Sequence, residues 1–295
     1  MKFSLGSWSD ERLQRVEKAL SEWVPPGGPA GLGDAMRYAV LDGGKRLRPL
    51  LVLAASEAVH GHAEATMRAA CAVELIHAYS LVHDDLPCMD NDVLRRGKPT
   101  VHVKYGEAPA LLAGDALQAL AFELLVPEAG EVPASVQARL ARLLARAAGE
   151  NGMAGGQAID LAAVGKALTE DELRRMHRLK TGALLHASVM MGAACGDTAA
   201  KAQQALSTYG EAVGLAFQVV DDILDVTADS ATLGKTAGKD ALHAKPTYVS
   251  LLGLEKARAY ARELLGQARN ALADSGLAQT SALLALAEMV VNRDN

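Results

Sequence analysis

The sequence predicts an all-α protein. Only 4% of its 295 residues are aromatic, and alanine and leucine dominate the hydrophobic half of the chain, a composition that favours helices over strands. Apolar residues recur at helical spacing, and no segment shows the sustained alternation typical of a strand. No repeat of fixed period and no change in composition marks a boundary, so we expect one domain over residues 1–295.

In the first half of the chain, amphipathic stretches are separated by proline- and glycine-rich turns. The first helix is predicted at 8–23, with Ser9 or Asp10 as its N-cap, and the Pro-Pro-Gly-Gly-Pro run at 25–29 ends it. Asp42-Gly43-Gly44 is a helix-end signal. The further helices expected in this half are 32–41, 46–60, 63–85, 106–126, 134–149 and 151–163.

The second half begins with a capping signal, Thr169 followed by Glu172. The helix that starts there should continue to about 193, and it contains Lys180-Thr181-Gly182. Such a polar group within an apolar helix indicates either a kink or the wall of a polar pocket. A helix at 199–227 precedes a flexible loop at 228–240, and further helices are expected at 246–252, 254–274 and 278–291.

Composition also limits the cellular setting. The formal net charge of -5 argues against nucleic-acid binding through bulk charge. Three widely spaced cysteines without a metal-binding spacing are typical of a reducing compartment. The longest apolar run, at 110–126, contains polar residues, and no signal-peptide pattern is present. We therefore expect a cytoplasmic protein without stable membrane insertion.

The stretch at 81–98 carries the strongest chemical signal. Four aspartates directly follow an apolar run: Asp84, Asp85, Asp90 and Asp92. Carboxylates this close to a core need a compensating cation, and a set of oxygen ligands suits Mg²⁺ that is shared with a phosphate. Basic residues that suit the phosphate follow at once, namely Arg95, Arg96 and Lys98. Because Pro87 interrupts the helix, a break must bring Asp90 beside Asp84.

A second acidic group lies in the helix predicted at 199–227. At roughly 100° per residue, one stripe of this helix carries Gln218, Asp221, Asp222 and Asp225. Apolar residues cover its other side, so the stripe faces a cavity more readily than bulk water. One such group alone is typical of a solvated surface, but two of them in apolar surroundings indicate a shared metal site.

Several cationic residues are candidates for holding an anion. Lys45 and Arg48 lie at a predicted helix start, where backbone N–H groups already favour negative charge. His77 shares a helix face with Asp84, and Lys235 and Lys239 lie in a loop that could close over a phosphate. Each has a plain alternative: a solvated basic turn, a structural histidine and a tolerated surface loop.

Taken in order, these motifs resemble the trans-isoprenyl diphosphate synthases, and most closely the bacterial farnesyl diphosphate synthases. The resemblance covers nearly the whole chain. Its carriers are residues 43–49 (GGKRLRP), 77–85 (HAYSLVHDD), 95–97 (RRG), 114–115 (GD), 155–157 (GGQ), 180–183 (KTGA) and 217–225 (FQVVDDILD).

The resemblance implies an isoprenoid-synthase helical bundle around a deep cavity, a homodimer, and head-to-tail condensation of isopentenyl diphosphate with an allylic diphosphate. About three Mg²⁺ ions would be bound with the substrate diphosphate. The implied metal ligands are Asp84, Asp90 and Asp221, supported by Asp85, Asp222 and Asp225. The residues implied for the allylic diphosphate are Arg95, Lys180 and Lys235, those for isopentenyl diphosphate are Lys45, Arg48, His77 and Arg96, and those near the cation are Thr181 and Gln218. Gly44 and Lys245 are expected to bind substrate as well.

Product length follows from the resemblance less directly. In the family an aromatic residue at the position of Tyr79 closes the pocket at fifteen carbons, although ideal periodicity places Ser80 under Asp84. The segment Cys88-Met89-Asp90-Asn91 also looks like geranylgeranyl diphosphate synthases, which keeps a twenty-carbon product open. Asn91 and Val93 replace acidic residues that are common in close relatives, and we expect tuning at most.

Three other functions compete with this interpretation. A terpene cyclase would normally replace the second acidic motif, which this chain keeps. A phosphohydrolase of the HD type is suggested by His83-Asp84, but His60, His62 and His77 have poor spacing for its other ligands. A non-catalytic partner subunit usually loses one acidic motif, whereas both are present here.

Overall fold

The computed structural model describes residues 3–41, 43–128, 130, 132–166, 168–227 and 247–293. These residues form an all-α fold with one minimal hairpin, which confirms the predicted class. The α-helices are α1 (Leu5–Trp23), α2 (Leu32–Val40), α3 (Leu47–Ala58), α4 (Ala63–Asp84), α5 (Val101–Tyr105), α6 (Glu107–Leu125), α7 (Ala134–Ala148), α8 (Met153–Ala162), α9 (Glu170–His177), α10 (Ala183–Ala194), α11 (Ala200–Thr227), α14 (Tyr248–Leu252), α15 (Leu254–Asp274) and α16 (Ser281–Val291).

Most of the predicted helices are found within a few residues of their expected ends. The capping box of Thr169 and Glu172 is confirmed. The predicted cap of the first helix is wrong: α1 begins at Leu5, with Ser4 as N-cap and without a side-chain hydrogen bond. Trp8 is buried and donates its indole N–H to Glu57 on α3 at 2.9 Å, so packing extends the helix past Ser9 and Asp10.

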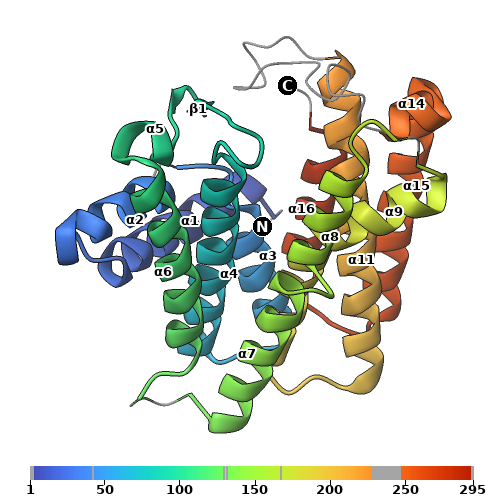
Figure 1. Cartoon of the computed structure of the whole chain (residues 1–295). Helices are drawn as coiled ribbons and strands as arrows, with labels where there is room; N and C mark the ends of the chain where they lie inside the picture. The colour runs from blue at the N-terminus through green and yellow to red at the C-terminus, as the bar shows by residue number, and fades with distance from the viewer. Residues whose placement is uncertain are drawn as a thin grey trace.

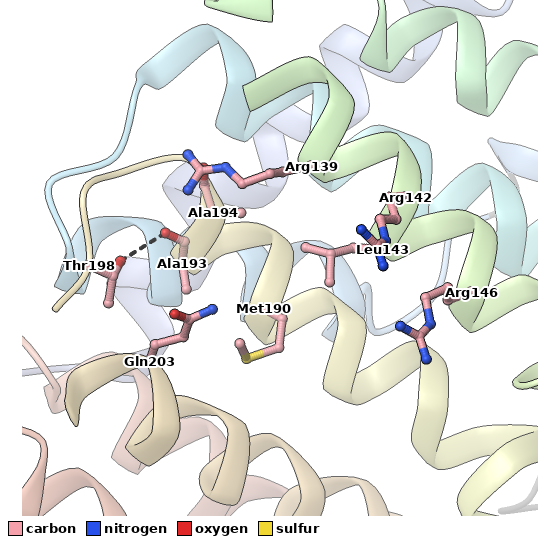
Figure 2. A pocket seen from close by; sticks show the side chains of 9 residues that line it. All are labelled: Arg139, Arg142, Leu143, Arg146, Met190, Ala193, Ala194, Thr198 and Gln203. Atoms are coloured by element: carbon pink, nitrogen blue, oxygen red, sulfur yellow. Dashed lines mark hydrogen bonds between the residues drawn. The ribbon is translucent and has the colours of Figure 1, made fainter. Parts of the chain in front are cut away.

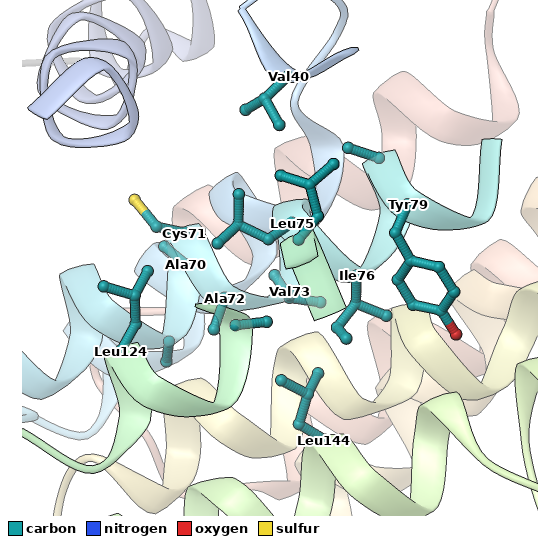
Figure 3. Close-up of a cluster of buried hydrophobic side chains, with 14 of the residues drawn as sticks. Val40, Ala70, Cys71, Ala72, Val73, Leu75, Ile76, Tyr79, Leu124 and Leu144 are labelled. Atoms are coloured by element: carbon teal, nitrogen blue, oxygen red, sulfur yellow. The ribbon is translucent and has the colours of Figure 1, made fainter. Parts of the chain in front are cut away.

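The long helices pack side by side around two hydrophobic clusters (Figure 1). One cluster joins residues of α1, α2, α4, α6 and α7, and Figure 3 shows part of it, including Ile76, Leu124 and Leu144. The other joins residues of α3, α10, α11, α15 and α16. Helix α10 packs on α3, α7 and α11 and so links the two clusters. The C-terminal ends of α4 and α11 lie at the same end of the bundle (Figure 1).

The predicted helix at 169–193 is divided in three. A π-helical segment, η2 (Arg178–Gly182), joins α9 to α10 and contains Lys180 and Thr181. Gly156 of α8 permits this geometry, since a Cβ there would lie 2.1 Å from the backbone nitrogen of Lys180. Single-turn π segments within helices are frequent at functional sites, and this one turns two polar side chains toward a cavity.

The chain folds back tightly after α4. The backbone N–H of Asp90 donates to the carbonyl oxygen of Asp84 at 2.8 Å, which is the break that Pro87 predicted. Strands β1 (Leu94–Arg95) and β2 (Lys98–Pro99) then form a two-residue hairpin that the sequence patterns did not indicate. Arg96 and Gly97, at φ 52° and 75°, form its turn and direct Arg96 back toward Gly43.

Helix α6 is the one helix of the described segments that is long and apolar enough to span a bilayer by length and composition alone. One of its faces packs against α4, where Gly114 lets the helices approach so closely that a Cβ would overlap the His83 ring. Leu111 and Leu112, on its other face, are 47% and 55% exposed. The helix is therefore a partner of α4 that keeps an apolar outer face.

Candidate active site

Two cavities share Arg48 and His77 and bring part of the predicted site residues together, but of the six predicted metal ligands only Asp84 lines either of them. The first, of about 410 Å³, we call the aspartate cavity; it is lined by Arg48, His77, Tyr79, Ser80, Leu81, His83, Asp84, Met89, Met153, Ala154, Gln157, Ala158, Leu161, Lys180 and Thr181. The second, of about 470 Å³, we call the basic cavity; it is lined by Gly44, Lys45, Arg46, Leu47, Arg48, Glu74, His77, Arg96, Phe217, Met289, Val290 and Arg293.

Asp84 lies at the C-terminal end of α4 and lines the aspartate cavity. Burial raises the pKa of its carboxyl group to about 6, and nearby Asp90 and Asp85 act in the same direction, against the opposing effect of Lys180. The negative end of the helix dipole also disfavours a carboxylate here. A buried carboxylate with these neighbours is stabilised by an added cation, as a metal site requires.

Asp85 and Asp90 differ from Asp84 in their surroundings. The side chain of Asp85 is 4% exposed, and both its oxygens accept hydrogen bonds from Arg95, at 2.6 to 3.0 Å. It therefore orients Arg95 in this structure, and its supporting role at a metal stays a prediction. Asp90 is exposed beside Asp84.

The second acidic group lies in the last two turns of α11. Asp222 is 2% exposed and accepts hydrogen bonds from the backbone N–H of Tyr248 at 2.8 Å and from the amide of Gln218 at 2.9 Å. Asp221 forms an ion pair with Arg293 at 2.8 Å, and Asp225 is buried. Asp221 also acts electrostatically on Arg48, which lines both cavities.

A hydrogen-bond chain connects this group with the aspartate cavity. The Thr181 hydroxyl donates to Gln218 Oε1 at 3.1 Å, and Gln218 in turn donates to Asp222. Because Thr181 gives its proton to Gln218, its oxygen lone pairs remain for the cavity. Beside it, Lys180 forms an ion pair with Asp160 of α8. The second cluster is thus connected through η2 to the wall of the cavity that Asp84 lines.

The basic cavity contains most of the residues predicted for a second anion. Burial lowers the pKa of His77 well below its ordinary value, and the neighbouring Arg48 and Arg96 lower it further. His77 is therefore a neutral N–H donor at pH 7. The Nε of Arg48 is buried and makes no hydrogen bond, whereas Lys45 is exposed at the rim. The guanidinium of Arg96 donates to the carbonyl oxygen of Gly43.

Sequence patterns missed the buried arginine between Lys45 and Arg48. Arg46 is 4% exposed and takes the left-handed backbone conformation, with φ 45°. It donates to Glu17 of α1 at 2.6 Å, to Glu74 of α4 at 2.7 Å and to the carbonyl oxygen of Val40 at 2.6 Å. It fixes the start of α3, and with it the two neighbouring cations.

Two other residues of these cavities were not singled out as site residues. Both amide atoms of Gln157 are buried without a hydrogen-bond partner where α8 lines the aspartate cavity. Arg293 lies over the Phe217 ring at 4.1 Å, in addition to its ion pair with Asp221. The 155–157 motif gave a signal for Gln157, but no local pattern indicates Arg293.

The residues that are described include no group of three or more carboxylate, imidazole or thiol side chains that converges on one point. The carboxylates of Asp84, Asp85 and Asp90 nevertheless offer oxygen ligands, and the raised pKa of Asp84 marks a site where a hard cation is favourable. The residues therefore fit Mg²⁺ bridged by a phosphate. Lys235, Lys239 and Lys245 lie outside the described residues.

Comparison with known proteins places this geometry in a family. The polyprenyl synthetase family model matches residues 29–280. The chain is 50% identical to the farnesyl diphosphate synthase of Escherichia coli over 291 residues, which is 96% of each chain, and 48% identical to the chloroplastic geranylgeranyl pyrophosphate synthase of Capsicum annuum, covering 99% of this chain and 80% of the other.

A solved structure agrees with these matches. The geranyltransferase of Helicobacter pylori complexed with magnesium and isoprenyl diphosphate superposes with a TM-score of 0.84 and 35% identity, over 99% of this chain and 98% of that one. This chain therefore belongs to the polyprenyl synthetase family, whose members use Mg²⁺ with the diphosphate substrate, and is a trans-prenyl diphosphate synthase.

Proposed function

We propose that this protein is a farnesyl diphosphate synthase. It would condense isopentenyl diphosphate with dimethylallyl diphosphate, and then with geranyl diphosphate, to give (2E,6E)-farnesyl diphosphate. The observation that carries the proposal is Tyr79, whose ring is 9% exposed and lines the aspartate cavity below Asp84. The ring lies edge-on to His83, with centroids 5.7 Å apart. Packed against His83, it limits the room for a longer chain.

The two cavities suit the two substrates. In the aspartate cavity, Arg95, Lys180 and the Lys235 loop would hold the allylic diphosphate, with about three Mg²⁺ ions bound between Asp84, Asp90 and Asp221. Asp85, Asp222 and Asp225 would orient these groups. In the basic cavity, Lys45, Arg48, His77 and Arg96 would hold isopentenyl diphosphate, assisted by Gly44 and Lys245. Because Arg48 and His77 line both cavities, the two substrates would lie close together.

Bound Mg²⁺ would stabilise the charge on the departing diphosphate. The side chains of the protein would stabilise the allylic cation, bind the leaving group and exclude water. Thr181, with Gln218 behind it, would direct oxygen lone pairs toward the allylic cation, and Arg95 and Lys180 would bind the leaving group. The isopentenyl double bond would attack the cation, and the departing diphosphate would take up the proton lost from the product, as the family resemblance implies. Apolar walls such as Met153 and Leu161 exclude water.

A twenty-carbon product is the second candidate, favoured by the Cys88-Met89-Asp90-Asn91 segment. The test uses purified protein, Mg²⁺, labelled isopentenyl diphosphate and either dimethylallyl or geranyl diphosphate, and sizes the alcohols after dephosphorylation. We expect fifteen carbons from the wild type and twenty or more from Tyr79→Ala. A twenty-carbon product from the wild type would reject the role of Tyr79, and no elongation at all would favour the non-catalytic subunit.

We also infer a homodimer in the cytoplasm. The exposed Leu111 and Leu112 give α6 an apolar outer face that a second copy would cover. The three cysteines are free thiols, as in a reducing compartment. Sedimentation velocity of the purified protein tests the assembly, with a species of twice the chain mass as the expected result and a monomer as the result against it.

A further inference from the structure

A second group of arginines lies on the bundle away from the two cavities described above. Arg139, Arg142 and Arg146 occupy successive turns of α7, and all three are exposed. Together with Leu143, Met190, Ala193, Ala194, Thr198 and Gln203 they line a cavity of about 220 Å³, which we call the arginine groove (Figure 2). None of these nine residues lines the aspartate or the basic cavity.

The charge of this groove is uncompensated within the part of the chain that the structure describes. No carboxylate lies within 4.0 Å of the Arg142 or Arg146 guanidinium, and Arg139 donates to the carbonyl oxygen of Ala194 at 3.1 Å. Like charges one turn apart repel, and Arg142 and Arg146 are four residues apart. In a chain with net charge -5, this local excess of positive charge favours an anion.

The floor of the groove is apolar, which suits an anion with a hydrocarbon part. Met190 and Ala193 of α10 are 8% and 4% exposed, and Figure 2 shows Met190 between the arginines of α7 and Gln203 of α11. Arg146 also lines an adjoining cavity of about 900 Å³, whose apolar lining includes Leu179, Ala183 and Leu215. That cavity is lined by Arg174 and Arg178 as well as by Glu211 and Glu263, so its further charges balance by number, whereas no carboxylate lines the groove. Charge therefore assigns an anionic head to the groove and leaves the apolar part of the adjoining cavity for a hydrocarbon tail.

The adjoining cavity reaches the back of the catalytic segment. Its lining includes Arg178, Leu179 and Gly182, three residues of η2, while Lys180 and Thr181 of the same segment line the aspartate cavity. A molecule in the adjoining cavity would therefore contact the π-helical turn from the side opposite the substrate. Binding there changes activity to the extent that it favours one arrangement of this turn.

We propose that the arginine groove and the adjoining cavity form a regulatory site for an isoprenyl diphosphate, separate from the catalytic cavities. The ligand class rests on the proposed function, because molecules of this class have both the charge to match three guanidinium groups and a methyl-branched apolar tail. The head would bind at Arg139, Arg142 and Arg146, and the tail would extend over α10 toward η2.

The test counts bound molecules. Isothermal titration of the wild type with farnesyl thiodiphosphate, an unreactive analogue, in the presence of Mg²⁺ should give two molecules per chain. The variant Arg142→Glu/Arg146→Glu, which keeps Arg139 on Ala194, should give one. The control Arg258→Glu/Arg262→Glu reverses two exposed arginines with the same spacing on α15 and should still give two. Inorganic pyrophosphate, which lacks the tail, should bind the groove at least tenfold more weakly.

Kinetics gives a second measurement. The analogue should inhibit the wild type by a mixed pattern against geranyl diphosphate, and the groove variant by a purely competitive one, with turnover otherwise unchanged. One molecule per chain in the wild type, or two in the groove variant with its helical circular dichroism intact, would overturn the proposal. The proposed function fails separately, through the product assay, because the binding count does not depend on turnover.

Discussion

The two aspartate clusters look alike in the sequence, but the protein compensates their negative charge to different degrees. Both lie at the C-terminal end of a long helix, where the helix dipole disfavours a carboxylate. On α11, Asp222 accepts two hydrogen bonds and Asp221 has an arginine partner. On α4, the side chain of Asp84 makes no hydrogen bond or ion pair in the described structure, and its pKa rises to about 6. Asp221 and Asp222 of the second cluster are held by the protein, whereas Asp84 of the first needs a cation from outside.

Helix α4 shows the same contrast within its own length. Glu74, ten residues before Asp84, is 3% exposed and is paired with Arg46 at 2.7 Å. Its charge supports the fold, because Arg46 fixes the loop that carries Lys45 and Arg48. The charge of Asp84 costs stability until a metal-bound diphosphate is present. On this one helix, the charge of Glu74 therefore supports the fold, and the charge of Asp84 serves the reaction.

The largest expected effect is the loss of turnover when either cluster is changed. Asp84→Asn and Asp221→Asn should each lower kcat at least roughly a thousandfold, because each removes a charge that balances the cations on the leaving group. Steady-state assays at saturating substrate and Mg²⁺ measure this effect. If only one variant lost activity while both kept their helical circular dichroism, a metal site shared by the two clusters would be rejected.

The variant Glu74→Gln should have the largest effect on stability. It leaves the buried guanidinium of Arg46 without one of its two charged partners, and breaking such a pair costs about 3 kcal/mol or more. In addition, the KM for isopentenyl diphosphate should rise about tenfold, equivalent to roughly 1.4 kcal/mol, with a smaller change for geranyl diphosphate. Urea unfolding and the two KM values measure these effects. Equal rises in both KM values would indicate a general structural defect instead.

The variant Asp84→Asn should have the opposite effect on stability in metal-free protein. A pKa raised from 3.8 to about 6 means that ionisation of Asp84 costs the folded state roughly 3 kcal/mol at pH 7. The cost is absent well below pH 3.8, where the group is protonated in both states, grows as the pH rises from 3.8 to about 6, and stays constant above that. Asp84→Asn should therefore be more stable than the wild type at pH 7 and equal to it near pH 3.

Two variants test whether this gain is specific. Asp222→Asn should lose about 1–3 kcal/mol at pH 7, because an amide cannot accept both hydrogen bonds that Asp222 accepts. Asp10→Asn, at an exposed position on α1, should change little. Urea unfolding in EDTA at several pH values makes the comparison. A loss of stability in Asp84→Asn at pH 7 would contradict the contrast between the two clusters.

How much could be predicted from the sequence depended on how far apart along the chain the interacting residues lie. The capping box of Thr169 and Glu172 and the aspartate stripe on α11 follow from local periodicity, and both are found. The hairpin at 94–99 has only two residues in each strand, too few for a pattern. Arg46 depends on partners 29 and 28 residues away, at Glu17 and Glu74, so local sequence could not distinguish it from its exposed neighbour Lys45.

The smallest expected effect concerns Arg293, which pairs with Asp221 and also lines the basic cavity. Its guanidinium lies 2.8 Å from Asp221 Oδ1, so a metal ion that binds this oxygen must compete with it. Removal of a partly exposed ion pair is worth about 0.5–1 kcal/mol, or roughly a two- to fivefold change in affinity. In Arg293→Gln the half-saturating Mg²⁺ concentration should fall by this factor, while the KM for isopentenyl diphosphate should rise.

Arg269→Gln, which removes an exposed pair with Glu288, should change neither value. A higher Mg²⁺ requirement in Arg293→Gln would show that Arg293 orients Asp221 for the metal instead of competing with it. The protein itself would then hold the second cluster in its metal-binding geometry.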